Sequence, residues 1–137
     1  MRRYVIVVIL LLALALAVVG GCEPEPAPAP ATGTYMDVTP AEAKELIDQN
    51  PDLVIIDVSP HYKLGHLPGA VHYYLGDGSL DMAILALDKS KKYLVYCHVD
   101  SVAIQGAQKL VDAGFQNVYR LEGNYRAWVD AGYPIET

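Results

Sequence analysis

The chain has 137 residues, which is enough for one domain of about 100 residues and a shorter additional segment. It contains 10 basic and 16 acidic residues, a formal net charge of −6. Removal of Arg2 and Arg3 with an export signal would leave eight basic residues and a net charge of −8. An acidic surface repels phosphate backbones and anionic lipid headgroups, so we do not expect nucleic acid among the partners of this protein.

The N-terminus has the pattern of an export signal. Two arginines precede an apolar run over residues 4–19, and Gly20 and Gly21 follow before Cys22. The run is shorter than the roughly 20 residues that a spanning helix needs. The segment ending at Cys22 resembles the lipobox of prokaryotic lipoproteins, which implies a signal peptide over residues 1–21 and lipidation of Cys22. An uncleaved anchor helix is the alternative, and both place the domain outside the cytoplasmic membrane.

Residues 22–34 form a predicted spacer after the lipidated cysteine. Every second residue from Pro24 to Pro30 is a proline, which blocks helix and sheet pairing and favours an extended polyproline II rod. At ~3.1 Å per residue, the spacer holds a domain up to roughly 35 Å from the bilayer. We therefore expect a globular domain over residues 35–137, anchored to the cell membrane through its lipid.

The globular part shows alternating helix and strand patterns. Thr39-Pro40-Ala41-Glu42 is a capping box that predicts a helix ending near Asn50. Strands are predicted over 53–56, 70–73, 93–96 and 117–121, and further helices over 79–86, 103–113 and 124–131. Strands that alternate with helices predict an α/β domain with a parallel sheet and helices on both faces.

Cys97 follows the predicted strand 93–96, at the sheet edge where ligand sites lie in open parallel sheets. We expect the loop over residues 97–102 to curl with its amides inward, as an anion nest backed by a helix N-terminus. The helix N-terminus alone would favour the nucleophilic thiolate by up to about one and a half pKa units. A buried, unreactive cysteine is the alternative.

Several separated segments together resemble the rhodanese-like domain family. They are Asp57-Val58, Gly65-His66-Leu67-Pro68-Gly69-Ala70, Tyr96-Cys97, Gly114-Phe115-Gln116-Asn117-Val118-Tyr119, Leu121-Glu122-Gly123 and Trp128. The resemblance implies a five-stranded, mostly parallel sheet and a persulfide on Cys97, with a small sulfur-containing donor and a thiol acceptor as partners. It also implies that backbone amides of the loop bind the substrate: His98, Val99, Asp100, Ser101, Val102 and Ala103.

The resemblance implies no cofactor, and no metal site is predicted. Cys97 and His98 would supply only two ligands, which is incomplete for zinc or copper. Within the resembling segments, we expect His66 to bond loop backbone and Asp57 to tie the same loop down. Trp128 is expected in the core.

The loop departs from the family's common pattern at three positions. Family members usually carry Gly at the position of Asp100, Arg at that of Val102 and Ser at that of Ala103. Loss of the Arg removes a bidentate anion donor, and Asp100 adds a like charge beside the thiolate. Both changes weaken the case for thiosulfate as the donor. Three side chains are candidates for restoring positive charge: His98, Arg120 and Arg126.

Three functions are consistent with these patterns. The favoured hypothesis is a lipid-anchored enzyme that accepts sulfane sulfur on Cys97 and passes it to a thiol. The second is a non-catalytic module of the same fold that binds a partner or a small anion, which the changed loop residues suggest. The third is a redox-responsive thiol, with Cys97 oxidised reversibly outside the cell.

Overall fold

The computed structural model describes residues 33–137. The predicted signal peptide, Cys22 and nearly all of the proline-rich spacer lie outside the described residues. Five strands form one sheet, and every pair of neighbouring strands is parallel. Within residues 33–137, no helix combines the length and the apolar character needed to cross a bilayer.

The strands follow the order β1-β5-β4-β2-β3 across the sheet. Their bounds are β1 Met36–Val38, β2 Val54–Asp57, β3 Val71–His72, β4 Lys92–Tyr96 and β5 Asn117–Leu121. The helices are α1 Pro40–Gln49, α2 Ser79–Ile84, α3 Asp100–Asp112 and α4 Asn124–Asp130. Two short 3₁₀ turns complete the fold, Tyr62–Leu64 and Leu75–Asp77.

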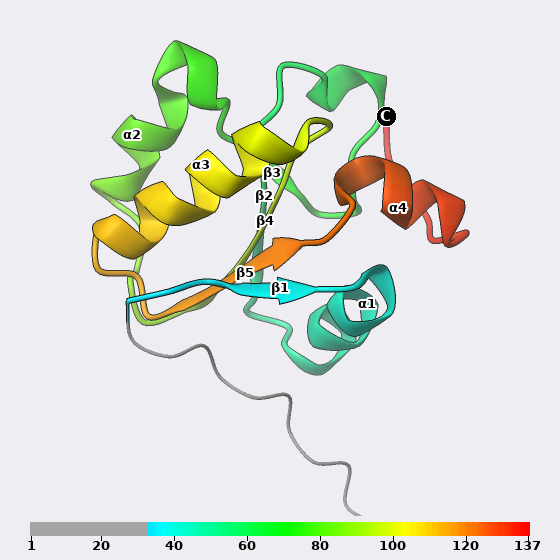
Figure 1. Cartoon of the computed structure of the whole chain (residues 1–137), viewed down its shortest axis with the longest axis horizontal. Helices are drawn as coiled ribbons and strands as arrows, with labels where there is room; N and C mark the ends of the chain where they lie inside the picture. Colours follow the sequence, from blue (N-terminus) through cyan, green and yellow to red (C-terminus); the bar gives the residue numbers. More distant parts are fainter. Residues whose placement is uncertain (1–32) are drawn as a thin grey trace, which may run out of the picture.

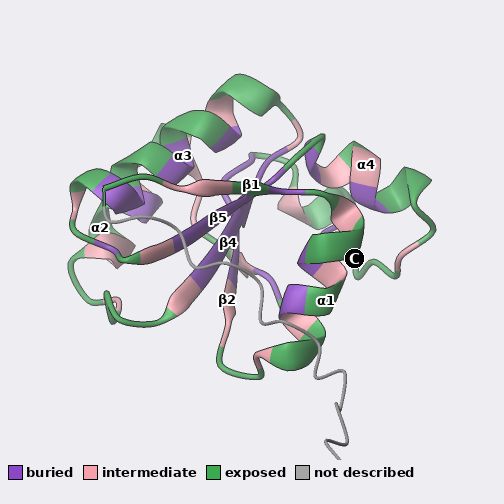
Figure 2. Cartoon of the chain, turned by 60° about the horizontal axis from the view of Figure 1, so that its bottom comes forward, coloured by how far each residue is buried: buried purple, intermediate pink, exposed green. Residues whose placement is uncertain are grey.

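The sheet lies between two layers of helices. In Figure 1, α2 and α3 cover one face, and α1 and α4 cover the other. Each face has its own apolar cluster: Leu110 of α3 belongs to the first, and Leu46 and Trp128 belong to the second. Figure 2 shows β4 and β5 buried along most of their length and the outer faces of the helices exposed. The α/β architecture expected from the sequence is confirmed.

The predicted cap of α1 is present in full. Thr39 N–H donates to Glu42 Oε2 at 2.8 Å, and Glu42 N–H donates to Thr39 Oγ1 at 3.3 Å. Pro40 occupies the first helical position, where its missing N–H has no intrahelical partner to lose. This cap fixes the start of α1 directly after β1.

Two elements differ from the expectation. The edge strand β1 was not predicted, because three residues are too few to show an alternating pattern. Helix α3 begins at Asp100 instead of Ala103: Val102 N–H and Ala103 N–H both donate to Val99 O at 3.2 Å, which closes the first turn three residues earlier. The loop after Cys97 is correspondingly shorter.

Candidate functional site

The candidate site lies at the carboxyl ends of β2 and β4, which pair side by side in the middle of the sheet. Asp57 stands opposite Tyr96 in this pairing, and Val58 N–H donates to Tyr96 O at 3.0 Å. Cys97 is the next residue of the chain, and its side chain belongs to the apolar cluster under α3. The residue is only 1% exposed. The nucleophile expected from the sequence is therefore at the expected sheet edge, but it is covered.

The thiol of Cys97 is in an environment that favours its protonated form. Burial is the main cause and raises its pKa above the ordinary value, and the nearby carboxylate of Asp57 raises it further. The backbone amides of Val99 and His98 act in the opposite direction by hydrogen bonding to the sulfur. Only these two of the amides expected in the nest lower the thiol pKa, and the predicted net lowering is wrong, because burial outweighs them.

Of the six substrate-binding residues predicted from the sequence, two act on the thiol through their backbone amides. His98 and Val99 face their amides to the sulfur. Val102 and Ala103 do not take part in the nest, because their amides donate to Val99 O within the first turn of α3. Ser101 is exposed on that same turn, and its carbonyl accepts a hydrogen bond from Gln105 Nε2.

His98 lies in a stack of aromatic rings beside the nucleophile. Its ring stacks on Tyr125 with a centroid distance of 4.2 Å, and the ring of His61 lies 5.4 Å away on a tilted plane. Burial lowers the pKa of His98, which favours the neutral imidazole at neutral pH. Its Nε2 is buried and has no hydrogen-bond partner within residues 33–137. A protonated His98 that activates Cys97, one of the sequence-based candidates, is therefore not supported.

Asp57, which the sequence predicts only as a tie for its loop, also acts on the thiol of Cys97. Its side chain is fully buried, and Oδ1 accepts a hydrogen bond from Ser59 N–H at 2.8 Å, as expected of a loop tie. Its Oδ2 has no partner in the described part of the chain. Besides acting on Cys97, Asp57 is the second cause, after burial, that raises the pKa of Tyr96. Asp57 lies beside the site because β2 pairs with β4, and this pairing of distant segments is the signal that would have identified it.

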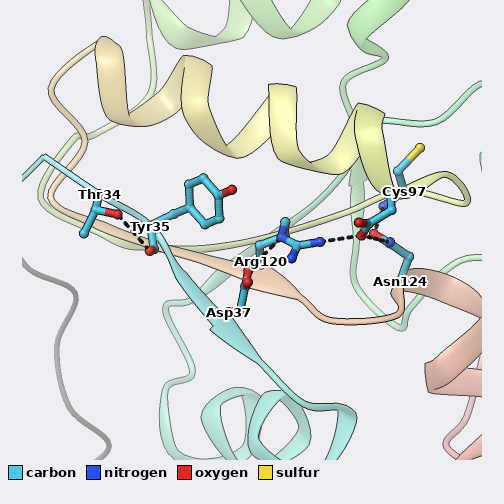
Figure 3. A network of polar contacts seen from close by, with 7 residues as sticks. Thr34, Tyr35, Asp37, Cys97, Arg120 and Asn124 are labelled. Carbon is cyan, nitrogen blue, oxygen red and sulfur yellow. Dashed lines mark hydrogen bonds and ion pairs between the residues drawn. The ribbon is translucent and has the colours of Figure 1, made fainter.

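Asp100 does not act on the thiol as the sequence suggested. Its carboxylate forms an ion pair with Arg120 Nη1, and Asn124 Nδ2 donates to the same Oδ1 at 2.9 Å (Figure 3). The prediction of a like charge beside the thiolate is therefore wrong for Asp100, and Asp57 takes that place. Arg120 is already paired, and the side chain of Arg126 is 83% exposed and pairs with Asp130. Neither is a free cation at the site.

The loop that carries His66 is held by local contacts and by the end of the chain. His66 Nδ1 lies 3.1 Å from Tyr62 O, and the two rings stack with a centroid distance of 3.8 Å. His66 and Glu136 also exchange two backbone hydrogen bonds of 2.9 Å. The structural role expected for His66 is confirmed. Across residues 33–137, no group of three or more His, Cys, Asp or Glu side chains is arranged to hold a metal ion.

Comparison with known proteins agrees with this geometry. The model of the family described as Rhodanese-like domain matches residues 39–131. The thiosulfate sulfurtransferase GlpE of Glaesserella parasuis is 29% identical, over 75% of this chain and 94% of its own length. The rhodanese-like domain of the Alr3790 protein from Anabaena superposes with a TM-score of 0.66 at 29% identity, covering 75% of this chain and 80% of its own.

A third relative carries a different sulfur compound in its name. The polysulfide-sulfur transferase of Wolinella succinogenes, solved as a homodimer, superposes with a TM-score of 0.64 at 26% identity. The match covers 77% of this chain and 80% of that one. Sulfur transfer is thus common to named relatives found by sequence and by structure.

Proposed function

This chain belongs to the rhodanese-like domain family, and from that membership we propose that it transfers sulfane sulfur through a persulfide on Cys97. The observation that carries the proposal is the position of Cys97. It follows the central strand β4, and the amides of His98 and Val99 face its sulfur. Amides in this arrangement stabilise a thiolate and the negative terminal sulfur of a persulfide in the manner of an oxyanion hole.

The transfer consists of two balanced substitutions at sulfur. The Cys97 thiolate attacks the outer sulfur of the donor, a new S–S bond forms, and the donor's own S–S bond breaks with its electron pair on the leaving fragment. An acceptor thiolate then attacks the outer sulfur of the persulfide and releases the Cys97 thiolate. The proton of Cys97 leaves before the first step and returns after the second, so no external oxidant or reductant is required.

The charges at the site favour a polysulfide over thiosulfate as the donor. Asp57 presents a negative charge to the thiol, and Arg120 is already held in ion pairs with Asp37 and Asp100. A compact dianion such as thiosulfate would meet repulsion without a compensating cation. A polysulfide spreads its negative charge over a longer chain than thiosulfate does, so it meets less repulsion at the thiol. The name of the Wolinella relative supports the same donor class.

Steady-state sulfur transfer to a thiol acceptor tests the proposal. We expect turnover with polysulfide, and kcat/KM for thiosulfate lower by about tenfold or more, because repulsion of the dianion raises its barrier. Cys97→Ser should abolish turnover, and Cys22→Ala, which keeps the loop intact, should retain it. Absence of turnover with polysulfide, thiosulfate and 3-mercaptopyruvate would favour the non-catalytic binding module instead. The 1% exposure of Cys97 is the specific observation that favours that second candidate.

The proposal includes a location outside the cytoplasmic membrane. The basic start, the apolar run and the lipobox-like segment before Cys22 support export and acylation of Cys22. The proline-rich spacer then joins the lipid to the domain, which begins with β1. The acceptor would accordingly be a thiol outside the cytoplasm. The anchored enzyme would diffuse only in the plane of the membrane.

A further inference from the structure

The backbone of Cys97 is held on both sides by the start of α4. Cys97 N–H donates to Asn124 Oδ1 at 3.2 Å, and Tyr125 N–H donates to Cys97 O at 3.0 Å. Asn124 is 4% exposed and has φ = 59°, the one positive φ of a non-glycine residue within 33–137. Asn tolerates this left-handed conformation better than most residues do. In Figure 3, the sulfur of Cys97 points away from Asn124.

Asn124 is itself fixed by a chain of charged groups that reaches the edge strand. Its Nδ2 donates to Asp100 Oδ1, which also pairs with Arg120. Arg120 Nε donates to Asp37 Oδ1 of β1 at 2.7 Å, and the ring of Tyr35 lies 5.9 Å from the guanidinium carbon. Figure 3 shows this sequence of contacts from β1 through β5 to the nucleophile.

The guanidinium of Arg120 is the centre of this network. Arg120 is only 7% exposed, and a buried cation is tolerated only when it is paired and hydrogen bonded. Asp37 and Asp100 supply that pairing, and they raise the pKa of Arg120, so the side chain stays charged. Asp100 is thus fixed at the first turn of α3, directly after the two residues whose amides face the sulfur.

We propose that Asp100, Arg120 and Asn124 are positioning residues that hold the Cys97 loop in its sulfur-accepting shape, by an internal ion pair and the Asn124 clamp. The proposal deepens the sulfur-transfer function and rests on it for its catalytic consequence. Asp100 anchors the start of α3 to Arg120.

Asn124→Gly is the most direct test, because it removes the clamp and leaves the backbone unstrained. Glycine adopts φ = 59° without a steric cost, but it has no side chain to bond Cys97 N–H and Asp100. We expect kcat/KM for sulfur transfer to fall by about tenfold, the effect of losing well-placed hydrogen bonds. The alkylation of Cys97 by iodoacetamide should also shift to higher pH, because the loop amides are no longer aimed at the sulfur.

Arg120→Gln, with Arg126→Gln as its matched control, tests the ion pair. The side chains of Asp37 and Asp100 are 47% and 61% exposed, so water can solvate both carboxylates and the variant should fold. We expect Arg120→Gln to shift the alkylation profile of Cys97 in the same direction as Asn124→Gly. Arg126→Gln removes a solvent-exposed pair and should leave the profile of the full-length protein unchanged.

The alkylation profile separates this proposal from the proposed function. It measures the environment of the thiol whether or not the protein transfers sulfur, and a purely structural role would lower the melting temperature without moving it. A shift in both Asn124→Gly and Arg120→Gln supports the positioning network. An unchanged profile in either variant overturns it, whatever the turnover assay shows.

Discussion

At the scale of single residues, the reactivity of Cys97 is a balance between burial and two backbone amides. The sequence places a cysteine after a buried strand, which predicts its position at the sheet edge. It does not predict how deeply the thiol is covered, because the cover comes from α3 and from other parts of the chain. The thiol is therefore protonated at rest, and it must lose its proton when it meets a donor.

The raised pKa of Cys97 predicts a pH dependence for its reactivity. Alkylation of the full-length protein should accelerate as pH rises, with its midpoint above about 8.5, the value of a free cysteine. Iodoacetamide treatment is carried out at several pH values from about 6 to about 10, on both sides of this reference value. Peptide mass spectrometry then distinguishes alkylation of Cys97 from alkylation of Cys22. A midpoint below the free value would mean that the amides of His98 and Val99 outweigh burial.

His98 predicts a loss of stability in mildly acidic solution. Burial lowers its pKa in the folded state, so the unfolded chain binds the proton more readily. Its contribution to the free energy of unfolding is therefore complete above about pH 6.5 and declines as pH falls below that value. Urea unfolding at several pH values should show this decline in the wild type and a weaker one in His98→Gln. Equal pH dependence of the two proteins would contradict the assignment.

At the scale of elements, long or patterned segments were predictable and short ones were not. The capping box at Thr39 and the apolar run of β2 are local signals, and both elements are present. The strand β1 has three residues and depends on pairing with β5, more than 80 positions away, so nothing local specifies it. The start of α3 was misplaced because Asp100 and Ser101 are ambiguous between a loop and a first helical turn.

The candidate site shows the same division between local and long-range information. Cys97 and the two residues after it lie in one segment, so the sequence alone names them as candidates. Asn124 is 27 positions from Cys97, and Asp57 reaches the thiol only because β2 pairs with β4. Contacts between distant segments follow from the packing of the sheet and its helices, which composition and periodicity do not encode.

Helix α3 approaches the sheet closely at Gly106, which predicts a steric limit at this position. A Cβ there would lie 3.1 Å from Val58 Cγ1 and 3.4 Å from Val95 Cγ1. Gly106→Val should lower the free energy of unfolding by about 2–3 kcal/mol, because the buried side chains of Val95 in β4 and of Val58, just after β2, leave no room for it. Gln105→Val, on the exposed face of the same helix, should cost less than about 1 kcal/mol. Urea denaturation compares the two, and similar losses would contradict close packing at Gly106.

At the scale of the whole molecule, the proposed location at a membrane depends on the lipid on Cys22, because the acidic surface would not hold the protein there. Its net charge of −6 would become more negative on removal of the basic N-terminus, so anionic headgroups would repel it. The protein expressed in a bacterium should stay in the membrane fraction after a wash at about 1 M salt, where surface charges are screened. The Cys22→Ala variant should either be released from the membrane fraction or keep its uncut signal peptide. Release of the wild type by salt would rule out lipid anchoring.

Sulfur transfer through Cys97 is tested most directly by the mass of the Cys97 peptide after treatment with polysulfide. We predict that the wild-type peptide gains one sulfur atom, that a thiol acceptor removes it, and that Cys97→Ser gains none. We expect this because Cys97 follows β4 and the amides of Val99 and His98 act on its sulfur. A Cys97 peptide of unchanged mass in the folded protein would contradict sulfur transfer and leave a rhodanese-like fold with another use.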